Sequence, residues 1–423
     1  MAYKITISTN GQLVNDSDTL QLVIVASVDL DGADQAYSAA DKGIKVKNWG
    51  STGLSYDIEE LLLTPASLSM VLTDAQGYLD SLFFGNTAEA LATNKEAEVQ
   101  IWLNGALEFQ GNINEDSLFS DIGRLEFKFS ARTKTDIINK KMVYKDGNPL
   151  DPMGPGYSAN YVNIQEAIKD VYKLVNPDVV LDFRSNLLMY ASRISAPSYS
   201  VTDIPFNECS VYAKYLYNYP SGDIQNCGDV LKRLAIDTGS FTGMIHSGRA
   251  FFHKLFMYDE TNVQELGKVL SYQKSYKYSL IEYVKITMDP AIFTNAVGEA
   301  GTFTGMDGKF IDKKSLMGCD GGESVMHWAK TDDPYSGAYR VQQLKDDTVG
   351  GGYSKSAQLL ANFWYKFRGN MQNCRADIFK VAGITYDFLK NFTYGGRKYQ
   401  IIEMTKNLAG NTTDITALYL GEL

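Results

Sequence analysis

Few side chains in this sequence have the type and spacing that catalysis needs. The histidines are His246, His253 and His327, and none stands in an H-E-x-x-H or H-x-E arrangement. The carboxylate pairs Asp332-Asp333 and Asp346-Asp347 have the chemistry of a glycosidase acid and base. Adjacent carboxylates on a strand face opposite ways, however, so the pairs do not indicate a shared site. The sequence predicts no catalytic residue.

Phosphate, metal and thiol chemistry has equally weak signals. Gly350–Gly352 is followed by tyrosine and serine, whereas a Walker loop continues with lysine. Cys209, Cys227, Cys319 and Cys374 stand far apart, which fits neither a zinc site nor a disulfide framework. We therefore expect buried free thiols, no metal ligands, no cofactor and no enzymatic activity.

Two local clusters have both a binding and a structural interpretation. Four tyrosines within eight residues could form a platform for sugar or partner binding, or could pair across strands; they are Tyr212, Tyr215, Tyr217 and Tyr219. A basic cluster could be a docking patch or a solvated hairpin; it consists of Arg132, Lys134, Lys140, Lys141 and Lys145.

Composition narrows the function classes. The chain has 423 residues, 44% hydrophobic and 21% charged, which fits two to four globular domains. Its formal net charge of −10 argues against a protein that grips nucleic-acid phosphate. The start of the chain lacks the apolar core of a signal peptide, and no run approaches the roughly 20 apolar residues of a membrane helix. We expect synthesis and folding in the cytosol.

Two stretches, one near each end, have the pattern of antiparallel β-meanders. Residues 98–103 alternate apolar and polar side chains, Asn104-Gly105 is a strong hairpin turn, and Leu125, Phe127 and Phe129 continue the alternation. Near the C-terminus, runs rich in β-branched and aromatic residues are separated by Gly395-Gly396 and Gly410-Asn411, where tight turns need positive φ. The polar stretch 31–53 reads as a loop or short edge region.

Helical signals lie between the meanders. Asn163 is a plausible N-cap, with Glu166 three residues later and Pro177 as the stop; the apolar stripe is Ile164, Ile168, Val171, Tyr172 and Val175. A second helix is predicted over 226–238, with Gly239 as its terminator and an apolar face of Cys227, Val230, Leu231, Leu234 and Ala235. A third helix is predicted over 354–367, after a glycine-rich excursion at 296–352.

The order of these elements resembles the hub proteins of phage tails: the central baseplate hub of contractile tails, the tail-tip hub of siphophages and the spike-hub protein of type VI secretion. Gly396–Leu420 is similar to their closing strand pattern, and Asp229–Ala235 with Gly239 is similar to one of their helices. The resemblance implies a mainly β fold with an α+β middle, in which two tube-type antiparallel β-barrel or meander domains flank helix-containing insert domains. We expect an N-terminal tube-type domain at 1–146, a linker and helical segment at 147–195, an α/β domain at 196–270 and a C-terminal tube-type domain at 271–423.

The resemblance also implies a structural role in the virion. Three chains with two tube-type domains each would form a pseudo-sixfold homotrimeric ring that joins the tail tube or distal tail protein to the tip, spike or fibre. DNA would pass through the channel during genome ejection without specific binding, and the acidic charge fits a lumen that repels phosphate. Two alternatives stay open. A carbohydrate- or receptor-binding tail module for host attachment would use the tyrosines, and a tail-associated peptidoglycan hydrolase would use Asp332 or Asp333.

Overall fold

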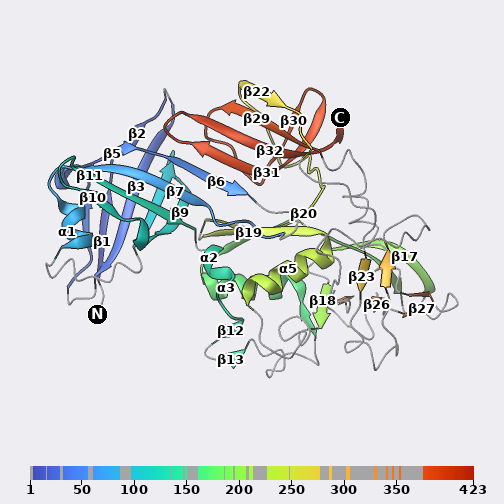
Figure 1. The fold of residues 1–423 in the computed structure, drawn as a ribbon. Helices are drawn as coiled ribbons and strands as arrows, with labels where there is room; N and C mark the ends of the chain where they lie inside the picture. The colour runs from blue at the N-terminus through green and yellow to red at the C-terminus, as the bar shows by residue number, and fades with distance from the viewer. Residues whose placement is uncertain are drawn as a thin grey trace.

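The computed structural model describes residues 3–28, 32–55, 61–85, 97–149, 161–212, 226–276 and 375–423, apart from short gaps at 16, 134, 146–147, 185, 194–195, 206–208 and 247; between 277 and 374 it describes only short strands. The chain is mainly β, as the sequence predicts. An N-terminal sheet, a middle region with two longer helices and a C-terminal sheet lie around a common centre (Figure 1).

The N-terminal sheet contains the first eleven strands. They are β1 (Tyr3–Ser8), β2 (Gln12–Leu13), β3 (Thr19–Val28), β4 (Gln35–Ser38), β5 (Ile44–Asn48), β6 (Ser51–Ser55), β7 (Ser67–Asp74), β8 (Glu98–Leu103), β9 (Ala106–Ile113), β10 (Phe119–Asp121) and β11 (Glu126–Arg132). Hydrogen-bonded neighbours follow the path β4-β1-β3-β8-β9-β11-β7, and β7 then pairs with both β5 and β6. Among the described strands no ladder joins β4 to β5, so this path stays open; of the two expected forms, barrel or meander, a closed barrel is not seen.

Alternation of apolar residues places the core of this sheet as predicted. Leu20, Leu22 and Ile24 of β3 are buried, and so are Val99 and Ile101 of β8. Of the two interpretations of 31–53, a loop or a short edge region, the loop is wrong, because this stretch forms the short strands β4, β5 and β6 and a 3-10 helix (Ala40–Lys42). Its polar residues misled the prediction, since the outer face of an antiparallel strand is solvated.

Turn chemistry is partly as predicted. The β8–β9 turn has positive φ at both Asn104 (51°) and Gly105 (78°), which a type I′ hairpin requires. Leu125, expected on the core face, instead has φ 53° in the turn before β11 and is 45% exposed. Gly395, Gly396 and Asn411 have positive φ, whereas Gly410 does not.

The middle region packs two helices beside a small sheet. Helix α3 (Ile164–Val175) begins where the Asn163 side chain accepts the N–H of Glu166 at 3.1 Å, and α5 (Cys227–Thr238) ends before Gly239, whose φ is 63°. Both predicted helices are confirmed, and their apolar stripes are buried apart from Val175, which is partly buried. The sheet has the order β15-β20-β19, with β15 (Val180–Arg184), β19 (Ser240–His246) and β20 (Arg249–Lys254).

Two short elements lie beside the N-terminal sheet (Figure 1): α1 (Tyr78–Phe84) and a 3-10 turn (Glu115–Ser117). The remaining elements belong to the middle and the stretch that follows it. They are α2 (Thr135–Ile138), β12 (Tyr144–Lys145), β13 (Asn148–Pro149), β14 (Tyr161–Asn163), β16 (Asn186–Arg193), β17 (Ala196–Pro205), β18 (Cys209–Tyr212), β23 (Lys285–Thr287), β24 (Thr302–Thr304), β25 (Trp328–Lys330), β26 (Arg340–Val341), β27 (Lys345–Asp346) and β28 (Gly352–Tyr353). The predicted helix 354–367 and most of the glycine-rich excursion lie outside the described residues.

The C-terminal sheet has the strand order β22-β29-β32-β31-β30-β21. Its strands are β21 (Val263–Gln264), β22 (Val269–Gln273), β29 (Ala376–Ala382), β30 (Asn391–Tyr394), β31 (Arg397–Asn407) and β32 (Thr412–Glu422). Aromatic rings fill its core: Phe392 and Tyr399 stack with centroids 5.1 Å apart, and Phe379 meets Tyr399 edge-on at the same separation.

Candidate functional site

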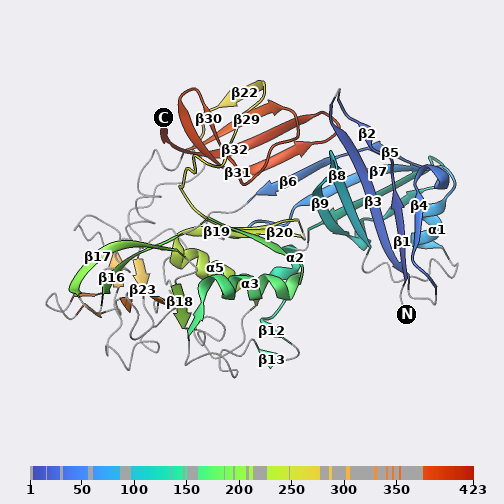
Figure 2. The same cartoon turned by 180° about the vertical axis from the view of Figure 1, so that it is seen from behind.

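The two large sheets are joined by a backbone ladder. Strand β6 pairs with β31 from Ser55↔Glu403 to Ser51↔Asn407, while its other edge pairs with β7. Figure 2 shows β6 leaving the N-terminal sheet and running up to β31. The N- and C-terminal sheets are therefore one continuous hydrogen-bonded unit.

Two glycines allow this crossing. Gly50 has φ 65°, and a Cβ there would lie 1.9 Å from the carbonyl oxygen of Ser69. A Cβ on Gly53 would lie 3.3 Å from the Thr405 hydroxyl on the facing strand. Only a residue without a side chain fits the turn before β6, because both the positive φ and the close backbone exclude a Cβ.

The middle sheet is attached to the N-terminal sheet by a short parallel bridge. The N–H of Leu63 donates to the carbonyl of Thr242 at 2.8 Å, and the N–H of Thr242 donates to the carbonyl of Leu61 at 3.0 Å. Leu61 and Leu63 are buried, so these hydrogen bonds are shielded from water.

Side-chain amides attach the middle sheet to the C-terminal sheet. The Gln400 amide accepts the N–H of Phe256 at 2.9 Å and donates to the carbonyl of Lys254 at 3.0 Å. Within the C-terminal sheet, Gln264 of β21 makes a similar double contact with the backbone of Asp387, at 2.9 and 2.8 Å. In both cases the amide oxygen accepts a backbone N–H and the amide nitrogen donates to a backbone carbonyl.

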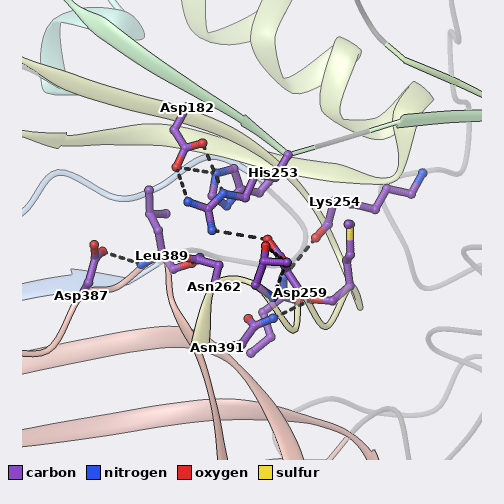
Figure 3. A network of polar contacts seen from close by, with 12 residues as sticks. Asp182, His253, Lys254, Asp259, Asn262, Asp387, Leu389 and Asn391 are labelled. Carbon is purple, nitrogen blue, oxygen red and sulfur yellow. Dashed lines mark hydrogen bonds and ion pairs between the residues drawn. The ribbon is translucent and has the colours of Figure 1, made fainter. Parts of the chain in front are cut away.

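Two asparagines continue this attachment (Figure 3). Asn262 donates its side-chain N–H to the carbonyl of Leu389 at 2.8 Å, and its backbone carbonyl accepts the N–H of Asn391 at 3.0 Å. Asn391 in turn donates to the carbonyl of Met257 at 3.1 Å. The segment that leaves β20 is thus hydrogen-bonded along its length to the C-terminal sheet.

An ionic cluster lies beside these amides. The Arg184 guanidinium contacts the Asp182 carboxylate at 2.9 Å and lies 3.8 Å from Asp259, while Nε2 of His253 lies 3.4 Å from Asp182 (Figure 3). The nearby His253 imidazole, together with the Arg184 guanidinium, lowers the pKa of Asp182 to about 2, despite partial burial. Burial lowers the pKa of His253 in spite of the nearby carboxylate.

His253 has a packing role in this cluster. Its imidazole lies edge-on to the rings of Phe251 and Phe241, with centroids 5.2 and 6.1 Å away. The ring therefore links an aromatic core to the Asp182 carboxylate.

A cavity of about 350 Å³ opens where the three parts of the chain meet. Two ion pairs cross it: Lys406 of β31 with Glu108 of β9, and Arg249 of β20 with Asp387, where both guanidinium nitrogens lie 3.3 Å from one carboxylate oxygen. Burial raises the pKa of Glu108 even though Lys406 opposes the shift. Burial, aided by Arg249, lowers the pKa of His246 at the same cavity to about 4, which favours its neutral form.

A second buried carboxylate lies inside the C-terminal sheet. Asp377 has no exposed surface; it pairs with Arg375 and accepts the hydroxyls of Tyr272 and Tyr399 at 2.8 Å each. Burial alone would raise its pKa, but these donors more than compensate and lower it. Sequence reasoning missed this cluster; the signal was a lone aspartate inside an apolar strand.

The structure tests few of the sequence-based site candidates. Most of these candidates lie outside the described residues: Tyr215, Tyr217, Tyr219, His327, Asp332, Asp333 and Asp347. Two others are described only as strand ends, namely Tyr212 and Asp346. The basic cluster is exposed at three of its positions, Arg132, Lys140 and Lys141. Lys134 lies outside the described residues, and Lys145 is described only as part of β12. Cys227 is a buried free thiol whose pKa burial raises to about 12.

Within the described ranges no group of three or more His, Cys, Asp or Glu residues could hold a metal ion. Among the helices described there, none has the length and hydropathy to span a membrane.

Comparison with known proteins gives structural but not sequence matches. No protein-family model matches the chain, and no curated protein matches its sequence. The fold is similar to the 43 kDa tail protein of prophage MuSo2 from Shewanella oneidensis, at 12% identity and TM-score 0.40 over 89% of this chain and 97% of that one. It is also similar to a tail protein from Neisseria meningitidis MC58 (10%, 0.43, covering 89% and 95%) and to prophage tail protein gp18 from Listeria monocytogenes EGD-e (9%, 0.38, covering 87% of each). At these identities and TM-scores the likeness does not assign a family or a function.

Proposed function

We propose that this chain is a structural protein of a phage virion, a tail hub that assembles as a homotrimeric ring between the tail tube and the tip or spike. The observation that carries the proposal is the β6–β31 ladder, which makes two mainly antiparallel sheets of one chain into a single unit. Three such chains would supply six sheets around one ring, matching a sixfold tube on one side and a threefold tip on the other.

The contacts of the junction favour a mechanical role over a catalytic one. Its amides bond to backbone groups of neighbouring segments, and its charged groups pair across the three parts of the chain. Such contacts hold domains in a fixed relation, which an adaptor between two rigid assemblies requires. The similar proteins reported above are tail proteins, and the proposal agrees with their names without depending on them.

The chain's charge suits a ring around passing DNA. With a net charge of −10 the ring would repel phosphate, so DNA would pass without being held. We propose no cofactor, no catalytic residue and no sequence-specific contact with DNA.

Purified virions and the isolated chain together test the proposal. Mass spectrometry and immunogold labelling of intact tails should place the protein at the tip-proximal end of the tube. Light scattering of the purified chain should give three times its 47.0 kDa mass, and negative-stain images should show rings with an open centre. Absence of the protein from purified tails would refute the tail role itself.

A further inference from the structure

Asparagine is followed by glycine at two places in this chain, Asn10-Gly11 and Asn104-Gly105. This dipeptide is prone to deamidation, because glycine has no side chain to block the approach of its own backbone nitrogen to the preceding side-chain amide. Asn10 lies in the connection between β1 and β2, and Asn104 is the first residue of the β8–β9 turn; all four residues are exposed. Exposure alone therefore does not distinguish the two places.

The Asn104 side chain is hydrogen-bonded at both of its polar atoms. Its Oδ1 accepts the backbone N–H of Thr19 at 2.8 Å, and its Nδ2 donates to the Asp18 carboxylate at 2.8 Å. The side-chain amides of Asn15 and Asn104 lower the pKa of Asp18, so this acceptor is ionised at neutral pH. The backbone N–H of Asn104 also donates to the Thr19 carbonyl at 2.9 Å. The side chain and backbone of Asn104 are thus both fixed against the start of β3.

The Asn10 side chain has no such restraint. Among the residues that the structure describes, none forms a hydrogen bond with it. Gly11 has no positive φ, and a Cβ there would lie 3.6 Å from the Cβ of Thr19, which is an ordinary contact. The Asn10 amide can therefore rotate toward the Gly11 nitrogen without breaking a hydrogen bond inside the protein.

We propose that Asn10 is a site of spontaneous deamidation in the folded chain, and that the hydrogen bonds of Asn104 protect the second Asn-Gly pair. In the reaction the Gly11 backbone nitrogen bonds to the side-chain carbonyl carbon of Asn10, gives up its proton and displaces the amide nitrogen as ammonia. Water then opens the cyclic imide at either carbonyl, which leaves aspartate or isoaspartate in place of Asn10. The modified chain carries an additional negative charge.

The protected pair is the one where the change would disturb more contacts. An aspartate in place of Asn104 would lose the Nδ2 donor and set a second carboxylate against Asp18, and like charges at this distance repel. The contact between the segment before β3 and the β8–β9 turn would weaken. At Asn10 the new charge would lie in an exposed connection, so we expect the modified chain to stay folded.

Incubation of the folded chain at mildly alkaline pH, with both asparagine peptides followed by mass spectrometry, tests the proposal. Asn10 should deamidate faster than Asn104 by roughly tenfold or more, the factor expected if one or two hydrogen bonds must break before the Asn104 side chain can rotate. Ion-exchange chromatography should show the added charge, with Asn10→Asp as the reference for its elution. Equal rates at the two asparagines of the folded chain would refute the proposal.

Two variants test the two sites separately. Gly11→Ala should strongly slow the reaction at Asn10 without disturbing the fold, since the added Cβ fits its surroundings but hinders the attack. Asp18→Ala removes the acceptor of the Asn104 amide and should speed deamidation there several-fold while leaving the rate at Asn10 unchanged. Circular dichroism and melting curves should match the wild type for both variants. An unchanged rate at Asn104 in a folded Asp18→Ala chain would overturn the protective role of this hydrogen bond.

The unfolded chain supplies the last control. In guanidinium chloride the two rates should become similar, because the hydrogen bonds of Asn104 are lost. A preference for Asn10 that persists in the unfolded chain would show that neighbouring residues cause it and not the fold, which would also overturn the proposal. The reaction needs only this chain and water, so its outcome is independent of the tail role.

Discussion

Replacing Glu108 by methionine should strongly destabilise the association of the N- and C-terminal sheets. Lys406 is 4% exposed and pairs with Glu108, a residue 298 positions away in the chain. Removing the carboxylate leaves an ammonium group in a site that water hardly reaches. Breaking a buried pair in this way costs about 3–5 kcal/mol of the free energy of unfolding.

The reverse replacement should cost less. With Lys406→Met the Glu108 carboxyl can take up a proton, because burial already raises its pKa. The double variant Glu108→Met/Lys406→Met removes both charges and should lie within about 1 kcal/mol of the wild type. A large loss of unfolding free energy in Glu108→Met but not in the double variant would show that the loss comes from the unpaired charge of Lys406 and not from lost side-chain packing.

Unfolding in guanidinium chloride, followed by the intrinsic fluorescence of the chain's four tryptophans, measures these differences. The control is Lys380→Met, which breaks the Lys380–Asp414 contact of 3.8 Å between side chains that are about half exposed. An exposed pair of this kind contributes at most about 1 kcal/mol. If Glu108→Met shifts the transition no further than Lys380→Met does, the pair does not hold the two sheets together and the reasoning fails.

Three further predictions concern the turns, the pH dependence and a helix start. Gly50→Ala should lower the melting temperature more than Gly105→Ala, because both positions have positive φ but only at Gly50 would a Cβ lie 1.9 Å from the Ser69 carbonyl; equal losses would contradict the steric argument. The free energy of unfolding should fall as the pH drops from about 6.5 to about 4, because unfolded His246 binds a proton near 6.5 whereas burial lowers its folded pKa to about 4. His246→Gln should flatten this part of the stability curve, and an unchanged slope would rule out His246 as its source. Asn163→Ala should cost about 1 kcal/mol in denaturant unfolding by removing the N-cap of α3, and Asn163→Ser should restore most of it.

Local signals in the sequence were sufficient for α3, α5 and several turns. Asn163 caps α3, Gly239 ends α5, and Asn104-Gly105 turns between β8 and β9, since each signal acts within a few residues of the element it defines. Alternation alone failed at Leu125, which continues the apolar pattern of β11 but lies in the turn before it. The alternation of apolar and polar residues does not reveal at which residue a strand stops pairing with its neighbour.

The sequence by itself determined a mainly β chain with two helices in its middle, because periodicity and capping are local properties. Only the tertiary structure decided that β6 crosses to β31, that Glu108 meets Lys406 and that these contacts surround a cavity. Strand partners far apart in sequence are chosen by how whole sheets pack, and polarity at 31–53 could not distinguish a loop from a strand with one solvated face. The junction, and with it the basis of the proposed hub, comes from those long-range contacts.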